Sequence, residues 1–353
     1  MKKFAKTLLA IFSIALLIPF IPSDNNTEKK ADTFGECMGN MHASLSDEYF
    51  IPENMTLKDD SFHSDLPLHI ETWYYEAIFN NNYSMIFIVT LFSSDGKSGT
   101  ALAGLYIYKE GHMEVMERAT AFSFYASNEG PFIKFFGDEV VNGYIDKYNR
   151  LSYDISFEKN ENGIELQFIN KTRGWKGEMG MGWWLAIPEL HVTGKMKIGG
   201  KVTSVEGKGY HDHNIFSLFT PVVEWGYMDG KVTCDSFSLV WGDIMHNRRY
   251  SDIFAILSEN GSYMAVLPES IEMRFYSYIY DHGRKIPTES FISIDDTKNS
   301  IFVELHMTTI DFHHIRLPFI HYWRYHVKVE GIIRTAFREE IVDEICIMER
   351  MLY

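Results

Sequence analysis

The sequence predicts an all-β fold, built as two antiparallel β-barrels in tandem. Aromatic residues make up 15% of its 353 residues, and aromatic side chains favour strands over helices. Turn signals that contain Gly or Asn recur at short intervals, and no long stretch carries the period of a helix. The resulting strands are too many for one barrel of about eight strands. We therefore expect two barrels, over residues 45–217 and 218–353.

The first barrel is predicted from short β-rich segments separated by turns. Residues 83–92 (YSMIFIVTLF) form a nearly continuous apolar run, which suits a strand covered on both faces. The Asn160–Gly163 segment has the composition of a turn between two strands. The other strands expected here cover residues 100–108, 113–124, 151–157 and 164–169.

Two-residue turn signals organise the rest of the chain. Gly199-Gly200, Asp229-Gly230 and Asn260-Gly261 each stand between two β-rich segments, as the tight turn of a hairpin requires. The strands expected here cover residues 195–198, 201–203, 225–228, 231–241, 254–258, 263–267, 303–307, 322–329 and 341–348.

The charge and the first residues bear on partners and location. A formal net charge of −15 argues against binding nucleic acid or anionic membranes through charge, so no nucleic-acid partner is expected. Three Lys residues precede an apolar run over residues 8–21, which is closer in length to a signal-peptide core than to a membrane-spanning helix. We expect residues 1–22 to be a signal peptide or N-terminal anchor and residues 23–44 a polar linker.

This leader predicts export. The protein is expected outside the cytoplasm, either secreted or attached to a membrane through its N-terminal segment only. Whether the leader is cleaved is left open. Three cysteines are too few for a disulfide framework, and a single bridge between Cys234 and Cys346 stays open as well.

The most informative stretch is residues 207–214 (GKGYHDHN), which places several chemically capable side chains between two strand-like regions. If it is extended, Tyr210, Asp212 and Asn214 share one face, and His211 and His213 share the other. One face of a barrel strand points inward, so one of these sets is expected to enter the barrel. Two interpretations remain open, a catalytic or binding site and a hydrogen-bonded polar network that is structural.

The pair His211 and His213 also has a pattern found in metal sites. Two histidines do not make a site, and a third ligand cannot be chosen from the sequence. The histidines considered for it are His246, His313, His314, His321 and His326. We therefore predict neither a metal nor any other cofactor.

Residues 207–214 resemble the G-x-G-Y-H-D-H-N signature of the carotenoid 1,2-hydratase (hydroxyneurosporene synthase) and AttH-like family. Other segments resemble that family in the same order, over roughly residues 56–353: ETWYY at 71–75, WWLAIP at 183–188, and YWRYHV at 322–327 followed by Gly331. The sequence departs from the family pattern at Thr72, at Ile215-Phe216, and at Gly182-Trp183-Trp184, where the hydratases carry a histidine.

The resemblance implies two tandem lipocalin-like antiparallel β-barrels and an apolar small-molecule ligand, an isoprenoid or polyene. In the hydratase reaction, a carboxyl buried in an apolar cavity has a raised pKa, so Asp212 could serve as the general acid. Tyr210, His211 and His213 would complete the catalytic set. The ligand-binding residues would be Trp73, Trp183, Trp184, Asn214 and Trp225. The aromatic faces of Trp183, Trp184, Trp225 and Tyr210 could stabilise a cation.

Two functions follow from this pattern. The first is an enzyme of the hydratase or cyclase type, a lyase or a related pericyclase, that acts on an isoprenoid or polyene by acid chemistry. The alternative is a non-catalytic carrier or sensor of an apolar molecule outside the cytoplasm. The retained Tyr210, His211, Asp212 and His213 favour chemistry, and the departures from the family pattern favour binding.

Overall fold

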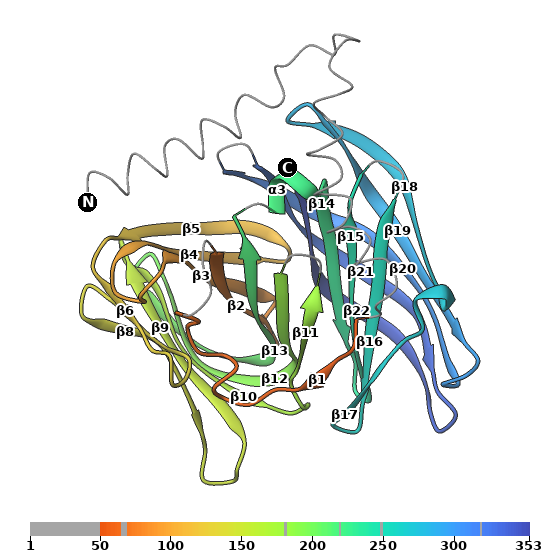
Figure 1. Ribbon diagram of the computed structural model, residues 1–353, viewed down its shortest axis with the longest axis horizontal. Coiled ribbons are helices and arrows are strands. Elements are labelled where there is room, and N and C mark those ends of the chain that lie inside the picture. The colour runs from red at the N-terminus through yellow and green to blue at the C-terminus, as the bar shows by residue number, and fades with distance from the viewer. Residues whose placement is uncertain (1–49, 65–68, 180–181, 219, 248–249, 318–319) are drawn as a thin grey trace, which may run out of the picture. The chain divides into compact units, whose positions relative to one another are not determined.

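The structure is a computed structural model that describes residues 50–64, 69–179, 182–218, 220–247, 250–317 and 320–353. Two antiparallel sheets make up most of this part of the chain, so the predicted all-β class and tandem lipocalin-like barrels are confirmed (Figure 1). The expected leader at 1–22, most of the segment before the first strand, including the linker at 23–44, and Cys37 lie outside the described residues.

The first sheet has thirteen strands and ends at residue 217. Its main order is β5-β4-β3-β2-β13-β12-β10-β9-β8-β7-β6, and β1 joins it through β11. The strands are β1 (Glu53–Asn54), β2 (His69–Phe79), β3 (Tyr83–Ser93), β4 (Gly99–Lys109), β5 (His112–Ala121), β6 (Phe124–Ala126), β7 (Phe132–Phe135), β8 (Asp138–Ile145), β9 (Leu151–Lys159), β10 (Asn162–Asn170), β11 (Trp175–Met179), β12 (Gly182–Ile198) and β13 (Lys201–Ser217).

The second sheet has nine strands and begins at residue 226. Its order is β17-β16-β15-β14-β22-β21-β20-β19-β18. The strands are β14 (Gly226–Thr233), β15 (Phe237–Met245), β16 (Ser251–Glu259), β17 (Ser262–Ala265), β18 (Ile271–Asp281), β19 (Arg284–Asp296), β20 (Ile301–Leu317), β21 (Ile320–Arg334) and β22 (Glu339–Leu352). The expected boundary at residues 217 and 218 falls between the two sheets.

Two of the three predicted two-residue turns are present. Gly199 and Gly200 have φ of 54° and 80° and close the long hairpin of β12 and β13. Asn260 and Gly261 have φ of 52° and 74° and join β16 to β17. Positive φ at both central residues matches the right-handed twist of the flanking strands, which is why Gly and Asn mark such turns.

The third predicted turn is wrong. Asp229 and Gly230 lie in the middle of β14, where Gly230 pairs with Trp241 on one side and Met348 on the other. A Cβ atom at Gly230 would stand 2.4 Å from the Trp241 ring, so this glycine allows a close approach of an indole. The same Asp-Gly pair that marks a hairpin in sequence therefore serves packing here.

Each sheet encloses its own apolar core, and a third apolar cluster joins them. The first core includes Met85, Phe87 and Val89, and the second includes Leu239 and Trp323. Residues from both sheets build the third cluster: Tyr74, Ile86, Tyr106, Tyr108, Trp175, Trp184, Ala186, Tyr210, Val240, Ile244, Phe254, Ile256, Ile315, Tyr322 and Ile347. Strand β3 is thus covered on both faces, as its apolar run predicts.

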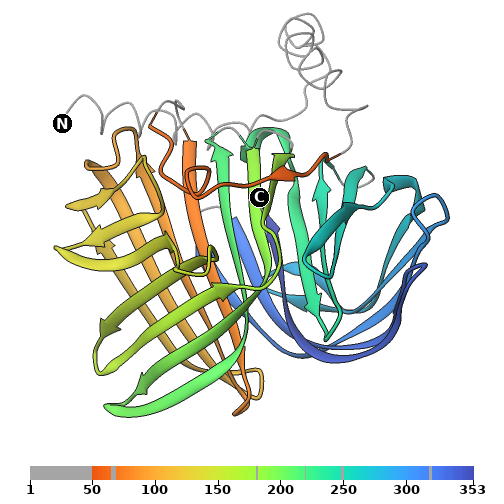
Figure 2. The same cartoon turned by 90° about the horizontal axis from the view of Figure 1, so that it is seen from below.

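The two sheets lie beside each other along β12, which contacts β14 and β15 (Figures 1 and 2). Pro188 and Glu189 interrupt the pairing of β12 with β13, since the register shifts between Ile187 and Leu190. A proline within a paired strand commonly accompanies such a bulge because it lacks an N–H donor.

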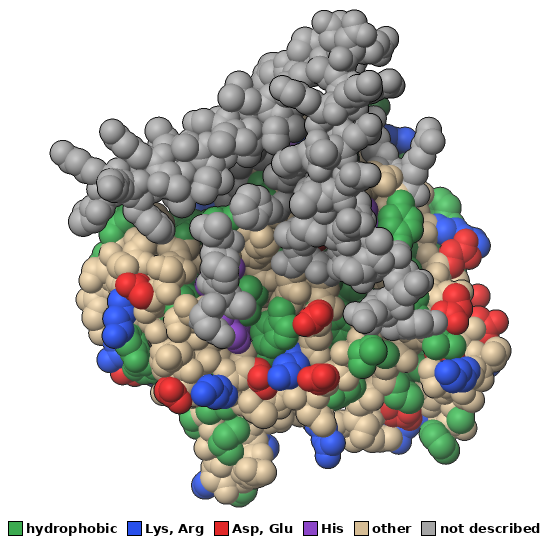
Figure 3. Space-filling model, viewed as in Figure 1, with side chains coloured by type: hydrophobic (Ala, Val, Ile, Leu, Met, Phe, Trp, Pro, Cys, Tyr) green, Lys and Arg blue, Asp and Glu red, His purple; other side chains and the backbone are tan. Residues whose placement is uncertain are grey.

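Regular helix is limited to short pieces in the part that the structure describes, α3 (Thr220–Val223) and the 3-10 turn η2 (Pro268–Ser270). None of its helices has the length and apolar character needed to cross a membrane. Cys234 and Cys346 are both buried and free, so the bridge that the sequence left open does not form. On the face drawn in Figure 3, acidic, basic and hydrophobic side chains are interspersed over the described surface.

Candidate functional site

Strand β13 carries the signature residues on its two opposite faces. It pairs with β12 on one edge and with β2 on the other, so residues 207–214 lie inside the first sheet. The side chains of His211 and His213 point into the first barrel, where they meet Asp60. Tyr210 lies on the other face, within the apolar cluster shared with the second sheet. The strand alternation expected from the sequence therefore holds.

We call the group inside the first barrel the barrel cluster. Its members are Asp60, His63, His69, Glu71, His211 and His213. His211 Nε2 lies 3.0 Å from Asp60 Oδ2, and His211 Nδ1 lies 2.9 Å from the carbonyl oxygen of Tyr74. The Tyr153 hydroxyl donates to Asp60 Oδ2 over 2.7 Å. The contacts with His211 and Tyr153 fix the position of the Asp60 carboxylate.

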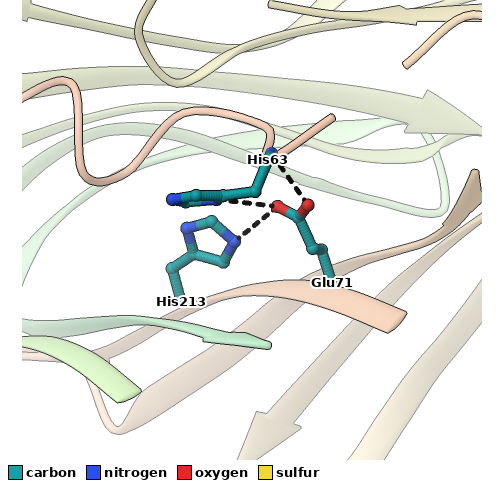
Figure 4. A group of neighbouring side chains, drawn as sticks. All are labelled: His63, Glu71 and His213. Atoms are coloured by element: carbon teal, nitrogen blue, oxygen red, sulfur yellow. Dashed lines mark hydrogen bonds and ion pairs between the residues drawn. The ribbon is translucent and has the colours of Figure 1, made fainter. Parts of the chain in front are cut away.

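Glu71 is the second carboxylate of the barrel cluster (Figure 4). Its oxygens lie 3.0 Å from His213 Nε2, 2.7 Å from His69 Nε2 and 3.5 Å from His63 Nδ1. Burial alone would raise the pKa of Glu71, but the hydrogen bonds from these histidines hold it well below its usual range. Glu71 is therefore an ionised carboxylate whose side chain is fully buried.

His213 stands between two carboxylates. Burial alone would lower its pKa, yet its contacts with Asp60 and Glu71 raise the pKa to about 9. At neutral pH the ring is therefore an imidazolium that bridges the two acids. The Trp73 ring stacks on it at 4.1 Å, and Trp183 meets it edge-on at 5.8 Å.

The other face of β13 looks onto a second group, which we call the inter-sheet network. Its ionisable acids and bases are Glu76, Asp212, Asp229, Lys231, Arg324 and Glu349. Lys231 Nζ pairs with Glu76 at 2.6 Å, and Arg324 Nε pairs with Glu349 at 2.7 Å. Asp212 accepts a hydrogen bond of 2.7 Å from Asn214 Nδ2. The first ion pair joins the two sheets.

The register of the strands explains this gathering. Tyr210 pairs with Glu76 across β13 and β2, and Glu349 of β22 pairs with both Asp229 and Arg324. Tyrosine rings surround the cations, with Lys231 Nζ 4.5 Å from the centre of the Tyr210 ring. Five of these six ionisable residues are buried, and Asp229 is half-buried. The network is thus largely shielded from bulk solvent.

The inter-sheet network holds more acids than bases. It has four carboxyl groups and two cations. Lys231 pairs with Glu76 and Arg324 pairs with Glu349, so both cations already have an acidic partner. Burial raises the pKa of Asp212 to about 8; Lys231 opposes this shift, and Glu349 and Glu76 add to it. Burial and the charge of Glu349 also raise the pKa of Asp229 well above its usual range. Asp212 is therefore mainly a neutral carboxylic acid at pH 7.

The surroundings of Asp212 differ from those expected. The sequence suggests an acid in an apolar cavity, whereas charged and aromatic groups from both sheets surround it. The predicted set is also divided by β13. Tyr210, Asp212, Asn214 and Trp184 lie on the inter-sheet face, and Trp73, Trp183, His211 and His213 lie on the barrel face. Trp225 packs on the core of the second barrel.

Several residues of both groups escape sequence reasoning. Asp60 and His63 precede β2 in a segment without any motif, and the five histidines considered as third metal ligands do not join the barrel cluster. Lys231 directly follows Asp229-Gly230, which the sequence analysis interprets as a turn, so no functional role is predicted for it. Glu71 and Arg324 stand within segments that resemble the family, which is the signal that could have found them.

Comparison with known proteins finds similar folds among solved structures but no match at the level of sequence. No protein-family model matches the chain, and no curated protein matches it in sequence. Solved structures do match. A Nitrosomonas europaea protein provisionally named AttH superposes with a TM-score of 0.60 at 13% identity, over 84% of this chain and 96% of that one.

Two further structures have the same arrangement. Kievitone hydratase from Nectria haematococca matches with a TM-score of 0.56 at 9% identity, over 86% of this chain and 98% of that one. CghA with Sch210972 matches with a TM-score of 0.53 at 8% identity, over 86% of this chain and 94% of that one. At such identities the likeness concerns the fold alone, and the chain therefore has the AttH-like, hydratase-type fold of two barrels in tandem.

Proposed function

We propose that this protein is a hydratase-type enzyme in which Asp212, held between the two sheets, is the general acid. One observation carries the proposal. Asp212 is a buried carboxyl without a cation partner of its own among the described residues, in a network whose two cations already pair with other acids. A neutral carboxylic acid at neutral pH is what protonation of an isolated alkene requires.

The proposed substrate is an apolar alkene of the isoprenoid or polyene class. The Asp212 carboxyl proton is transferred to one alkene carbon, which leaves a carbocation on the other carbon and a carboxylate on Asp212. A water molecule adds to the cation through its oxygen, and its surplus proton returns to Asp212. Water is thus added across the double bond, and the acid is regenerated.

The neighbours of Asp212 suit each half of this cycle. Lys231 lies close enough for its charge to lower the pKa of Asp212, so it stabilises the carboxylate formed when the proton leaves. The Tyr210 hydroxyl and Asn214 orient the carboxyl group. Trp184 packs in the same cluster and offers an aromatic face for the developing cation.

Two lines of likeness support this reaction class. Kievitone hydratase, one of the matched structures, is a hydratase by name and has the same two-barrel fold. The signature at residues 207–214 resembles that of carotenoid 1,2-hydratases, in which water adds to a polyene end. A cyclase that uses the same acid remains within the proposal, because the resemblance at residues 207–214 implies either a hydratase or a related cyclase.

A second candidate is a non-catalytic carrier or sensor of an apolar molecule outside the cytoplasm. It is favoured by the satisfied state of the network, since Asp212 already accepts a hydrogen bond from Asn214 and both cations are paired. A carboxyl that serves structure alone would have this environment too.

The decisive variant is Asp212→Asn, which keeps the shape and polarity of the side chain but cannot supply an acidic proton. The purified full chain is incubated in ¹⁸O-labelled water with linear isoprenoids and polyenes, and the products are identified by mass spectrometry. We expect the variant to lose at least about 100-fold in turnover, as loss of a general acid does, with little change in melting temperature.

The matched control is Asp243→Asn. Asp243 is also a buried acid whose pKa burial raises, but it belongs to β15 and makes no contact with the inter-sheet network in the described residues. Its turnover should stay at the level of the unmodified protein. Unchanged turnover in Asp212→Asn with a clear loss of stability would reject the acid role. A retained ligand without turnover in any variant would favour the carrier.

A further inference from the structure

The barrel cluster is left without a role by the proposed acid, which lies on the opposite face of β13. Within it, His63, Glu71 and His213 each offer a metal-ligand atom, and these atoms all lie within 4.8 Å of one another. They come from three separate segments: the loop before β2, strand β2 itself, and strand β13 (Figure 4). The tertiary structure alone brings them together.

The spacing of these atoms suits a metal ion. Glu71 Oε2 lies 3.0 Å from His213 Nε2 and 3.5 Å from His63 Nδ1. A tetrahedral ion with bonds of about 2.0–2.1 Å holds neighbouring ligand atoms about 3.3 Å apart, midway between those two values. The two distances from Glu71 therefore fit a bound ion closely, and the ligand atoms of His63 and His213 lie within 4.8 Å of each other.

The surroundings also resemble those of a metal site. A histidine ligand usually presents its second nitrogen to a carboxylate, which orients the ring. His213 Nδ1 lies 3.2 Å from Asp60 Oδ1 in this way. The two atoms are close but not aligned as a hydrogen bond, so both are buried without a hydrogen-bond partner. The other oxygen of Glu71, Oε1, lies 2.7 Å from His69 Nε2 and accepts a hydrogen bond of 2.8 Å from the backbone N–H of His63. These contacts orient the carboxylate.

Access and charge complete the case. The side chains of Asp60, Glu71 and His213 are fully buried, whereas the His63 side chain is 25% exposed and marks the route from solvent. Two carboxylates in the interior of a barrel are costly unless a cation balances them.

We propose that His63, Glu71 and His213 bind a divalent transition metal ion, with Zn²⁺ as the first candidate and Asp60 as the carboxylate that orients His213. Two imidazole nitrogens and one carboxylate oxygen favour such ions over Mg²⁺ and Ca²⁺, which prefer oxygen ligands. Three protein ligands leave a coordination position for water or a further group. The site is independent of the proposed acid on the other face of β13.

The test uses the purified full chain, stripped with a chelator and titrated with ZnCl₂ by calorimetry. His63→Ala is the primary variant because its side chain is partly exposed and its loss should leave the fold intact. We expect Zn²⁺ to bind the unmodified chain with a dissociation constant in the micromolar range or below. His63→Ala should weaken this binding at least about 10-fold, the smallest effect usual for loss of a group supporting a metal site.

Two controls separate this site from other histidines. His191→Ala removes a half-exposed histidine of the first barrel outside the cluster and should leave the affinity unchanged. His314→Ala removes a histidine that stacks on His282, a pair that could hold Zn²⁺ on the second barrel. It too should leave the His63-dependent binding intact.

A second measurement does not depend on affinity alone. Zn²⁺ should raise the melting temperature of the unmodified chain and of Asp212→Asn, but not that of His63→Ala, because only a bound ion stabilises the folded state. Absence of Zn²⁺ binding to the folded chain, or binding that His63→Ala leaves unchanged, would overturn the site. In that case the His213 imidazolium is the permanent counter-charge. Neither result bears on turnover by Asp212.

Discussion

Single side chains in this protein acquire their chemistry from the strand face on which they stand. Asp212 and His213 are neighbours in sequence, yet their pKa values rise for different reasons. Burial raises the pKa of the Asp212 carboxyl, whereas two nearby carboxylates raise the pKa of the His213 ring. His326 shows the opposite effect. It lies on β21 with its Nε2 atom 2.8 Å from Ser84 Oγ of β3, at the edge of the inter-sheet network.

The neutral state of His326 in the folded protein predicts a loss of stability in acid. Burial lowers its pKa to about 3, and the charges of Arg324, Lys231 and His112 add to this effect, while Tyr108 packs on the ring. The unfolded chain takes up a proton below about pH 6.5 and the folded chain does not, so stability present above that pH is lost as the pH falls towards 3. At pH 5 the loss is about 2 kcal/mol for this one group.

The replacement His326→Gln should remove that part of the pH dependence, because Gln keeps a polar contact for Ser84 and does not titrate. Urea unfolding at pH 7.5 and pH 5 measures the difference. His306→Gln, an exposed histidine on the neighbouring strand β20, serves as the control and should keep the slope of the unmodified protein. An equally steep loss of stability in His326→Gln would refute the assignment.

At the scale of elements, the strands place the functional groups through their alternation and register. Two strands of the first sheet, β2 and β13, contribute to both the barrel cluster and the inter-sheet network. From the second sheet, β14 supplies Lys231 and β22 supplies Glu349. Close approach of β14 to its neighbours depends on Gly230, which the Trp241 ring covers.

Gly230→Ala should therefore destabilise the protein. The added Cβ would stand 2.4 Å from Trp241 and 3.0 Å from Met348, in a region packed on both sides. Overpacking of this kind costs about 1–3 kcal/mol. Gly130→Ala is the control, because its Cβ would meet only Leu57 at 3.7 Å or more. Equal midpoints of urea unfolding for the two variants would contradict this account of Gly230.

At the scale of the whole molecule, two barrels share one polar site within one apolar cluster. The cluster draws residues from both sheets, and the pair of Lys231 and Glu76 crosses between them. The net charge of −15 is carried mainly outside this site, and acidic and basic side chains are mixed on the face in Figure 3. A net negative charge of this size favours solubility.

Export is the prediction that belongs to this scale. Three Lys residues followed by an apolar run of signal-peptide length should direct the chain out of the cytoplasm, where we propose that it meets its apolar ligand. To measure its location, cells that express the full sequence are fractionated, and the protein is detected in each fraction with an antibody against the second barrel. Deletion of residues 2–22 should retain the protein in the cytoplasm. Full-length protein found soluble in the cytoplasm would contradict export.

Much of the fold could be read in the sequence because the patterns involved are local. Gly199-Gly200 and Asn260-Gly261 mark turns, since their positive φ values suit residues that tolerate that conformation. The Asp229-Gly230 pair misled because a glycine demanded by a distant indole looks the same as one demanded by a turn. Local sequence does not carry that distinction.

For the candidate site, the sequence by itself determined which residues of 207–214 share a face, because alternation along a strand needs no knowledge of the rest of the chain. Only the tertiary structure decided what each face meets. Asp60 reaches His211 across 151 positions of sequence, and Lys231 reaches Glu76 from the other sheet. Charge, burial and hence pKa depend on these distant partners, so the chemistry of Asp212 and His213 is settled by packing between strands that no local pattern relates.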